Sequence, residues 1–374
     1  MGLLNLFSKR ETPVPQTGGN DPAISFPQDA VCIAVKITGG LGDAIVHARV
    51  IAELAKLSPK IHFYIFPAAF KAGQWIFRSI HAPIDVLPPS LFDFYCKAGA
   101  DMILFLNTFA VFNEQNVNIA KITKLAPLLL NALSSTMQTR IPWNVFIDRH
   151  PFLDGAFAHM ASARRYSRYD FIPQMLGIPV PDNRLELPSS DREYLKIHSA
   201  YPSYITFNTG FDEAFPLSSQ TTTKSYPVEH WTRLIAALHQ EYPDLGIVQI
   251  GGKNSLPIAG ANINLAGKTS LEECAGILKH AVLHLDTEGG LVHVCASLGI
   301  RSAVLFGPTN MEYFAYPQNI NIRNSRCSDC WWSTQTWMEH CPRLKSRAEC
   351  MYENTPELVL MRIRPVLQKV SSKA

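Results

Sequence analysis

A chain of 374 residues exceeds the size that one hydrophobic core usually serves, so its length predicts two domains. Hydrophobic residues make up 47% and charged residues 17%, which excludes a polar chain without a folded core. The 34 Lys and Arg and the 31 Asp and Glu are scattered and the net charge is only +3, so we expect no nucleic-acid partner. No apolar run reaches the roughly 18 residues that a membrane-spanning helix needs.

Residues 1–28 hold a short apolar stretch followed by Lys9, Arg10 and a proline-rich spacer, without a long apolar segment or a small-residue cleavage site. We expect a disordered, unprocessed tail. Its apolar residues could dip weakly into a lipid interface, although a frayed terminus is the preferred interpretation. The expected location is therefore the cytoplasm, with peripheral contact to the inner face of the membrane as the alternative.

The first half, residues 29–180, has the pattern of an α/β domain. An apolar, β-branched run is followed by a glycine-rich turn and then by apolar residues at helical spacing over 41–57. Stretches long enough for crossover helices separate the later apolar runs, which is typical of a parallel sheet. The predicted strands are 31–37, 61–66, 84–87 and 102–106. Residues 108–150 are less regular and are interpreted as a partly helical elaboration.

The second half, residues 181–355, repeats this pattern after a proline-rich segment suited to an interdomain link. Its predicted strands are 204–208, 246–252, 281–286 and 302–307, and its predicted helices start near 228, 270 and 289. Two doubly wound parallel sheets bind ligands beyond the carboxyl ends of their strands, so a cleft between the halves is the expected site.

A glycine pair marks the turn in DTEGGLVHV, where a strand ends and a helix begins. Backbone N–H groups at Gly289 and Gly290, together with the positive end of the helix dipole, suit a phosphate group. Asp286 and Glu288 could take sugar or ribose hydroxyls, and His293 could donate to a phosphate. The alternative is that the glycines only permit tight strand–helix packing and that the histidine belongs to the core.

A second glycine-rich turn, ITGGLGDA, differs from the dinucleotide fingerprint. Ile45 replaces its third glycine, and no acidic residue closes the strand that ends at Phe66, so a dehydrogenase is disfavoured. The loop, with Gly40 and Gly42, instead delivers Asp43 to the mouth of the cleft. An acidic residue at a helix start is also favourable by itself, so capping is the alternative role of Asp43.

Lys224 follows a polar insert, residues 211–223, and precedes a helix entered through Pro227. A lysine in this place can reach a diphosphate as a point charge, and a solvated loop lysine is the alternative. The stretch KTSLEE further along contains a Ser/Thr-x-x-Glu capping box that begins at Thr269 or Ser270, which predicts a helix start and no function.

Four of the eight cysteines are scattered in apolar surroundings and four cluster near the C-terminus. The clustered spacing, C-x2-C-x10-C-x8-C over 327–350, is typical of a tetrahedral thiolate site for zinc or iron in a reducing compartment. Such a site would be structural, because four cysteines leave no open coordination position. Free thiols, and after them disulfides, are the alternatives. The candidate ligands are Cys327, Cys330, Cys341 and Cys350.

In this order the motifs VKITGGLGDAI, KSYPVEHWTRLI, NLAGKTSLEECAGIL and LDTEGGLVHVCASLGIRSAVLFGPT, with the four-cysteine tail, resemble glycosyltransferase family nine, the heptosyltransferases and their relatives. The resemblance covers about residues 31–370. It implies a GT-B fold, in which two Rossmann-like domains face a central cleft and a C-terminal helix, residues 356–374, crosses back to the first domain. It also implies an ADP-activated heptose donor and inversion at the anomeric carbon.

By the same resemblance, Asp43 corresponds to the general base and Lys224 to the diphosphate contact, and no catalytic divalent cation is expected. The donor-binding turn would comprise Asp286, Gly289, Gly290 and His293. This chain has Asp-Thr-Glu-Gly-Gly where many members have Asp-Ser/Thr-Gly, and we expect Thr287 and Glu288 to bind the donor as well, although their alignment to the sugar is not fixed by the resemblance. Relatives that glycosylate autotransporter adhesins bind iron through clustered cysteines, which adds iron as an option for the cysteine loop.

Two functions follow from these residues. The first is an inverting glycosyltransferase that moves a sugar, most often heptose from ADP-heptose, to a hydroxyl of a lipopolysaccharide, capsule or protein acceptor, with a homo-oligomer as one option. The second is a catalytically silent nucleotide-sugar-binding or scaffold protein with a structural metal finger. An epimerase or dehydrogenase would share the α/β class but lacks the fingerprint and a Tyr-x-x-x-Lys pair.

Overall fold

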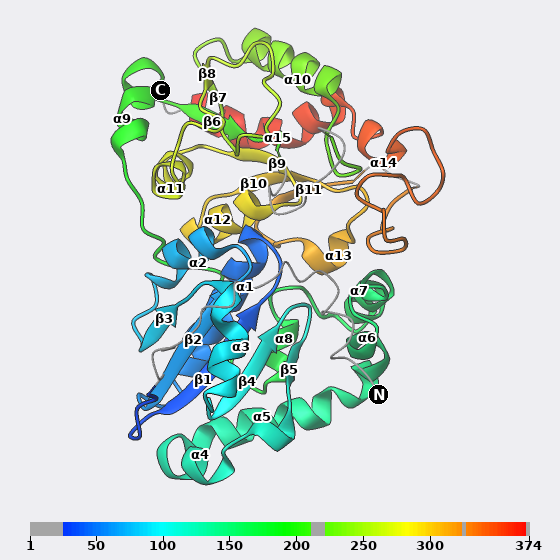
Figure 1. Ribbon diagram of the computed structural model, residues 1–374. Helices are drawn as coiled ribbons and strands as arrows, with labels where there is room; N and C mark the ends of the chain where they lie inside the picture. Colours follow the sequence, from blue (N-terminus) through cyan, green and yellow to red (C-terminus); the bar gives the residue numbers. More distant parts are fainter. Residues whose placement is uncertain (1–24, 211–220, 324–326, 372–374) are drawn as a thin grey trace, which may run out of the picture.

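The computed structural model describes residues 25–210, 221–323 and 327–371 (Figure 1). The predicted tail, residues 1–28, and the insert, residues 211–223, therefore lie mostly outside the described residues. In the described part, no helix combines the length and the apolar character that crossing a bilayer requires.

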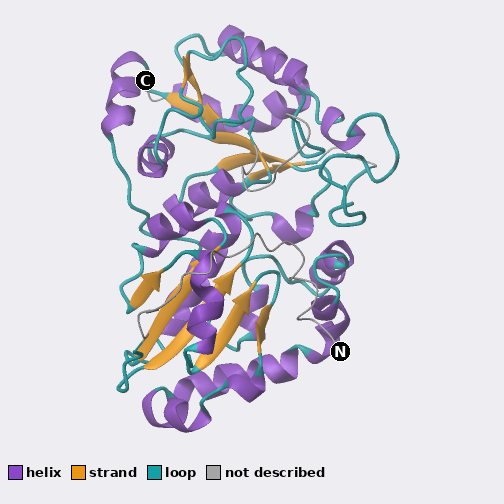
Figure 2. Ribbon diagram, viewed as in Figure 1, coloured by secondary structure: helices purple, strands orange, loops and turns teal. Residues whose placement is uncertain are grey.

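The N-terminal half contains a five-stranded sheet in the order β3-β2-β1-β4-β5. The first four strands in this order are parallel, and β5 runs antiparallel to β4. Nearly every residue of β1 is buried, since helices cover both faces of the sheet, and this explains its unbroken apolar run (Figure 2). The strands are β1 (Val31–Ile37), β2 (Ile61–Pro67), β3 (Ile84–Val86), β4 (Met102–Leu106) and β5 (Ala110–Phe112).

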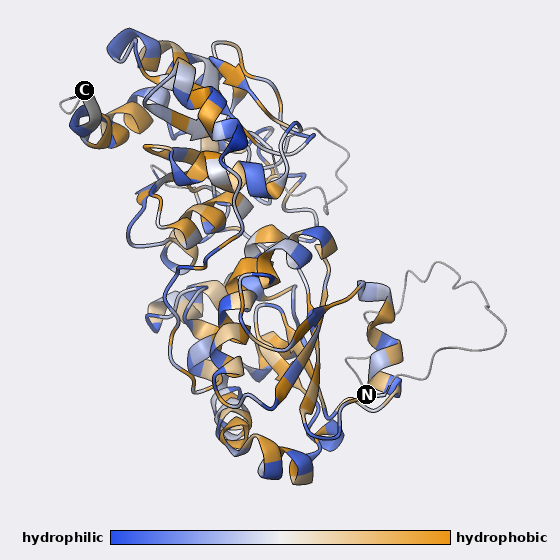
Figure 3. Cartoon of the chain, turned by 90° about the vertical axis from the view of Figure 1, so that its left-hand side faces the viewer, coloured by the Kyte–Doolittle hydropathy of each residue, from blue (hydrophilic) through white to orange (hydrophobic). Residues whose placement is uncertain are grey.

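Helices follow the strands in the expected alternation, and hydrophobic residues run along the strands of this half in Figure 3. The helices α1 (Leu41–Ala55), α2 (Phe70–Phe77) and α3 (Phe92–Lys97) belong to the alternation, with a 3₁₀ turn at Pro89–Leu91. The elaboration is mainly helical. It comprises 3₁₀ turns at Glu114–Asn116 and Ile141–Trp143 and the helices α4 (Ile119–Leu125), α5 (Pro127–Thr139) and α6 (Asn144–Asp148), followed by α7 (Asp154–Ala163) and α8 (Phe171–Met175).

The C-terminal half contains a six-stranded parallel sheet in the order β11-β10-β9-β6-β7-β8. Its strands are β6 (Tyr204–Phe207), β7 (Gly246–Gln249), β8 (Ile263–Asn264), β9 (His284–Thr287), β10 (Ser302–Leu305) and β11 (Ile320–Ile322). Its helices are α9 (Arg192–Ala200), α10 (Val228–Glu241), α11 (Leu271–Lys279), α12 (Gly290–Leu298), α13 (Met311–Phe314), α14 (Glu349–Tyr352) and α15 (Pro356–Ser371). The predicted capping box begins α11, where Ser270 and Glu273 exchange hydrogen bonds.

The two halves pack against each other mainly through α1 and α12, whose N-termini meet where the domains face each other in Figure 1. These are the helices that follow the two glycine-rich turns. The α/β class and the two-domain architecture predicted from the sequence are therefore confirmed, and the sheets direct both turns into one interdomain region.

The C-terminal helix is the exception. We expected residues 356–374 to cross back to the N-terminal half, and the described part of the helix does not do so. The buried residues Val359, Ile363 and Leu367 of α15 recur every four positions and enter the same core as Trp231 and Leu234 of α10. The apolar face of α15 packs against the C-terminal domain, so the helix completes the hydrophobic core of that domain.

Candidate functional site

Asp43 caps α1 and faces the cleft at the same time. Its Oδ2 accepts a hydrogen bond of 3.3 Å from the N–H of Gly40, so the capping role is confirmed. Gly39 has φ +92°, and a Cβ there would lie 2.1 Å from the Asp43 carboxylate. The side chain of Asp43 nevertheless remains 40% exposed, so capping leaves part of the carboxylate open to the cleft.

The other carboxylate oxygen of Asp43 is held by Arg168, which the sequence did not single out. Arg168 Nη2 donates to Asp43 Oδ1 at 2.7 Å, and only 4% of Arg168 is exposed. Burial favours the neutral form of Asp43, but the charge of Arg168 outweighs it, and the pKa of Asp43 lies below its ordinary value. The carboxylate is thus ionised at neutral pH.

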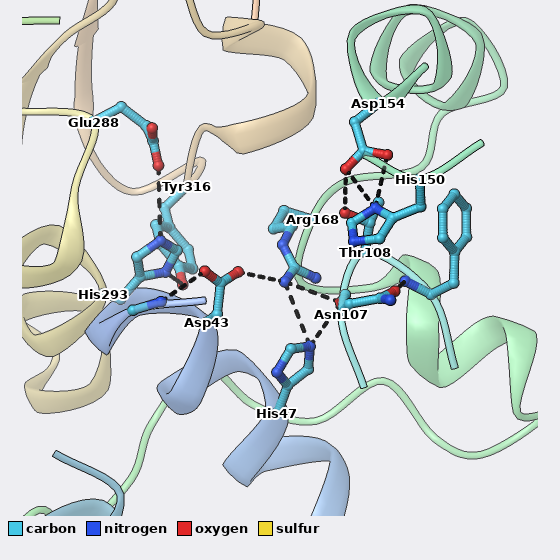
Figure 4. A network of polar contacts seen from close by, with 12 residues as sticks. Asp43, His47, Asn107, Thr108, His150, Asp154, Arg168, Glu288, His293 and Tyr316 are labelled. Atoms are coloured by element: carbon cyan, nitrogen blue, oxygen red, sulfur yellow. Dashed lines mark hydrogen bonds and ion pairs between the residues drawn. The ribbon is translucent and has the colours of Figure 1, made fainter. Parts of the chain in front are cut away.

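A buried histidine lies beneath this ion pair (Figure 4). His47 Nε2 lies 2.8 Å from the carbonyl oxygen of Asn107, which also accepts from Arg168 Nη2 at 3.3 Å. Burial first, and the charge of Arg168 second, lower the pKa of His47 to about 3, so the ring is neutral and donates from Nε2. His47 and Asn107 therefore fix the position of Arg168 without adding charge.

Across the cleft, Lys224 forms an ion pair with Glu288, with Nζ 2.6 Å from Oε2. Burial opposes the charge of Glu288, but Lys224 and His293 overcome it and lower the pKa of Glu288 to about 2. His293 Nε2 lies 3.9 Å from the other oxygen of Glu288. The lysine and the histidine predicted to meet a phosphate thus both face the Glu288 carboxylate.

Tyr316 orients His293. Arg49 Nη1 donates to the Tyr316 hydroxyl at 3.0 Å, and this hydroxyl lies 2.6 Å from His293 Nδ1. With Arg49 as its donor, the Tyr316 hydroxyl keeps its own hydrogen for a hydrogen bond to Nδ1, and the other ring nitrogen, Nε2, faces Glu288. Tyr316 is 1% exposed, so the contact is enclosed.

Asp286 does not reach the cleft as we expected of a residue that takes sugar hydroxyls. Both of its oxygens accept from Asn208 Nδ2 at 3.2 Å, and one also accepts from the N–H of Thr287 at 2.7 Å. His284 lies 3.3 Å away on the other side. Asp286 is 1% exposed, so it does not face solvent. Its hydrogen bond to the N–H of Thr287 instead stabilises the turn that carries this half-buried residue.

The glycines of the two turns leave space mainly for the opposite half of the protein, and less for a ligand. A Cβ on Gly290 would lie 3.0–3.2 Å from the Leu41 side chain, and a Cβ on Gly42 would lie 2.5 Å from the His293 ring. A Cβ on Gly289 would meet only the Thr287 carbonyl, at 3.7 Å. The phosphate interpretation is therefore retained only for the N–H groups that begin α12.

The four clustered cysteines are near one another, but no group of three or more metal-ligating side chains is assembled among the described residues. Burial first, and then the thiols of Cys327, Cys330 and Cys341, together raise the pKa of Cys350 to about 12. The pKa of Cys330 rises to about 11, from burial first and then from Cys341 and Cys327. The thiols thus lie close enough to disfavour each other's thiolates, which a bound cation would reverse.

The cysteine loop, residues 327–350, lies against both halves. The Trp331 carbonyl approaches Gly155 of α7 so closely that a Cβ there would lie 2.0 Å from it. On the other side, Thr223 donates from its N–H to the Met338 carbonyl at 2.8 Å and from its hydroxyl to the Trp337 carbonyl at 2.7 Å. The loop therefore positions the residue next to Lys224.

Two Rossmann-like domains that face each other across paired helix N-termini define a GT-B protein. The sequence model of glycosyltransferase family 9 (heptosyltransferase) matches residues 139–341, more than half of the chain. The chain belongs to this family and is a glycosyltransferase. The resemblance noted in the sequence is therefore confirmed.

Several solved structures share this fold. The ADP-heptose lipopolysaccharide heptosyltransferase II of E. coli is 14% identical with a TM-score of 0.55, over 91% of this chain and 99% of that one. A family 9 glycosyltransferase of Veillonella parvula is 16% identical with a TM-score of 0.57, over 93% and 99%. TibC, an iron-containing dodecameric glycosyltransferase of enterotoxigenic E. coli, is 16% identical with a TM-score of 0.57, over 92% and 81%. A comparison with curated proteins found no match.

The ion pair of Asp43 and Arg168 generates a first prediction. Replacing Arg168→Gln removes the positive charge that holds the pKa of Asp43 down but leaves the carboxylate partly enclosed, so the pKa of Asp43 should rise. Titration of the carboxyl carbon by NMR measures this. Arg164→Gln, whose guanidinium lies over the Trp143 ring, is the control and should leave the pKa of Asp43 unchanged. A pKa that stays low in Arg168→Gln contradicts the assignment.

Proposed function

We propose that the protein transfers a sugar with inversion from a nucleoside diphosphate donor, with ADP-heptose as the first candidate, to an acceptor hydroxyl. The observation that carries the proposal is the partly exposed, ionised carboxylate of Asp43 in one half, opposite Lys224 and the N-terminus of α12 in the other. The names of two structures with the same fold support the donor class, since one is an ADP-heptose enzyme and TibC was solved with ADP-D-β-D-heptose.

In this mechanism Asp43 accepts the proton of the acceptor hydroxyl while the oxygen attacks the anomeric carbon. Attack comes from the face opposite the leaving diphosphate, so one displacement gives one inversion. Arg168 keeps the carboxylate ionised but also makes it a weak base. The proton therefore moves late, when the new C–O bond has made the hydroxyl acidic.

The leaving diphosphate would bind the groups that contact Glu288 in the structure. Lys224 exchanges the Glu288 carboxylate for a phosphate, and the N–H groups that begin α12 contribute without a side chain at Gly289. Lys224 and the N-terminus of α12 would together balance the charge of the diphosphate, so no divalent cation is needed in the cleft. Since Glu288 is an anion with a pKa of about 2, it competes with the diphosphate for Lys224 at neutral pH.

The acceptor classes stay those expected from the sequence, namely a lipopolysaccharide sugar, a capsule precursor or a protein hydroxyl. Peripheral contact with the inner membrane and a homo-oligomer also stay proposals, the latter supported by the dodecameric assembly in the name of TibC.

Asp43→Asn tests the base. The substitution keeps an oxygen for the Gly40 N–H but cannot accept a proton, so transfer from ADP-heptose should fall about 10²- to 10⁴-fold. Affinity for ADP, measured by calorimetry, should stay unchanged. Asp93→Asn, which removes another exposed first-turn carboxylate, is the matched control and should keep full activity. Unchanged turnover in Asp43→Asn removes this residue from the role. A wild-type protein that binds ADP-heptose without hydrolysing or transferring it supports the scaffold alternative.

Lys224 and Glu288 give a prediction with opposite signs. Lys224→Ala should weaken ADP binding about 10- to 100-fold, the usual range for a hydrogen bond to a charged group. Glu288→Gln should instead strengthen ADP binding, because the competing anion is gone. Lys279→Ala, at the end of α11, is the control. Calorimetry that finds weaker binding in both variants would show that Glu288 helps the donor instead of competing with it.

The cysteine loop is proposed to hold one structural iron or zinc ion through Cys327, Cys330, Cys341 and Cys350. The spacing of the cysteines and their mutual effect on pKa support this, and free thiols are the alternative. When bound, the ion would keep the thiolates together and so keep the loop against Thr223.

Metal analysis of the full chain, purified under reducing conditions, should find about one ion per chain, the stoichiometry of a four-cysteine site. Cys330→Ser should lose the ion, whereas Cys96→Ser, outside the loop, should retain it. Removal of the ion by a chelator should also weaken ADP binding, because the loop holds the residue before Lys224. Four thiols that react freely in a metal-free native protein contradict the metal site.

A further inference from the structure

A second polar cluster lies beside the residues assigned to transfer (Figure 4). Thr108 Oγ1 donates to Asp154 Oδ2 at 2.7 Å, and His150 Nδ1 lies 2.9 and 3.0 Å from the two oxygens of the same carboxylate. Asp154 is 1% exposed and Thr108 is 6% exposed, so the contact between them is enclosed. The hydrogen bond joins the turn between β4 and β5 to the start of α7.

A threonine, a histidine and an aspartate together could form a nucleophilic triad, but the geometry here is different. In a triad the histidine lies between the hydroxyl and the carboxylate and accepts the proton of the hydroxyl. Here the carboxylate of Asp154 lies between the other two side chains, so the hydroxyl of Thr108 donates to an acid and not to a base. The cluster is therefore suited to holding Thr108 in place.

Thr108 is the middle residue of a tight turn. Asn107 Oδ1 accepts from the N–H of Phe109 at 2.7 Å, and the N–H of Asn107 donates to the carbonyl of Phe109 at 3.0 Å. The hydroxyl of Thr108 points out of this turn to α7, and the Phe109 ring packs against Phe157 of the same helix with centroids 4.7 Å apart. The turn thus has both a polar and an apolar attachment to α7.

The main-chain carbonyl of Asn107 in this turn holds the guanidinium of Arg168. Arg168 Nη2 donates to this carbonyl at 3.3 Å and to Asp43 Oδ1 at 2.7 Å. The other terminal nitrogen, Nη1, is buried and has no hydrogen-bond partner among the described residues. The main chain of Arg168 is fixed separately, since its N–H donates to the Tyr313 carbonyl at 2.7 Å. The place of the guanidinium therefore depends on where the Asn107 carbonyl lies.

We propose that Thr108 and Asp154 are positioning residues for the guanidinium of Arg168. Their hydrogen bond fixes the turn, the carbonyl of the turn fixes the guanidinium, and the guanidinium keeps the carboxylate of Asp43 ionised. The inference deepens the proposed function and rests on it, because Asp43 is the base of that reaction. Thr108 and Asp154 act on this base through Arg168.

Thr108 can be replaced without changing any charge near Asp43. The titratable groups that face Asp43 are Arg168, His47 of α1 and His293 of α12. Asp154 is itself a charge that acts on Arg168, so its replacement would combine an electrostatic effect with a positional one. A changed pKa of Asp43 in a Thr108 variant therefore reports the position of Arg168.

Titration of the Asp43 carboxyl carbon by NMR on the full chain tests the positioning. Thr108→Val keeps the shape of the side chain but removes the hydroxyl, so the pKa of Asp43 should rise by about half a unit or more, part of the roughly one to three units that a close opposite charge gives. Thr108→Ala also lacks the hydroxyl and should give the same rise. Thr108→Ser keeps the hydroxyl and should retain the wild-type pKa. Thr123→Val on α4, whose hydroxyl donates to the Ile119 carbonyl, is the matched control.

A double-mutant cycle shows whether the effect passes through Arg168. In the Arg168→Gln background, Thr108→Val should leave the pKa of Asp43 unchanged, because the group that the threonine positions is gone. The proposal is overturned if Thr108→Val and Thr108→Ala leave this pKa at its wild-type value. It is also overturned if Thr108→Val raises the pKa equally in both backgrounds.

The pKa can be read in a protein that transfers no sugar, so this result is independent of the proposed function. If the protein transfers sugar, the acidic limb of the pH profile of kcat should move to higher pH in Thr108→Val, because the reaction needs the ionised carboxylate. A raised pKa of Asp43 with an unmoved acidic limb would count against Asp43 as the base and would leave the positioning by Thr108 supported.

Discussion

The close approach of two helix N-termini is the constraint on which the site depends. Leu41 of α1 and Gly290 of α12, and likewise Gly42 and the His293 ring, leave no room for a Cβ between them. Each glycine therefore lets the opposite half come near. Without this contact Asp43 would not stand opposite the turn with Glu288 and His293, because both carboxylates sit at the starts of these helices. The geometry of the cleft is thus set by backbone approach before any ligand enters.

Charge is balanced within each wall of the cleft. Asp43 is paired with Arg168, and Glu288 is paired with Lys224. Each pair is mostly enclosed, so its charges interact more strongly than they would in water, and an unpaired partner would be costly. The two pairs differ in their expected use. The first fixes the protonation state of a carboxylate that stays in place, whereas the second must open for the donor.

The sequence predicted what depends on local pattern. The strands, the alternating helices, the two glycine turns and the capping box at Ser270 all follow from periodicity and turn chemistry, and the structure has them. The role of Arg168 could not be predicted, because its ion pair with Asp43 forms only when segments distant in sequence meet in the fold. The amphipathic stripe of α15 predicted a helix but not which core it joins. The predicted exposure of Asp286 to the cleft was wrong, because the sequence at a strand end does not show whether a side chain points to the cleft or to the interior.

The cysteine loop joins the two domains at one side of the molecule. Its Trp331 carbonyl is pressed against α7 of the first domain, and its Trp337 and Met338 carbonyls hold Thr223 of the second. Because the loop contacts both domains, it links them at the side of the molecule where it lies. Separation of the domains at this side would have to break these contacts, whereas separation at the opposite side would leave them intact.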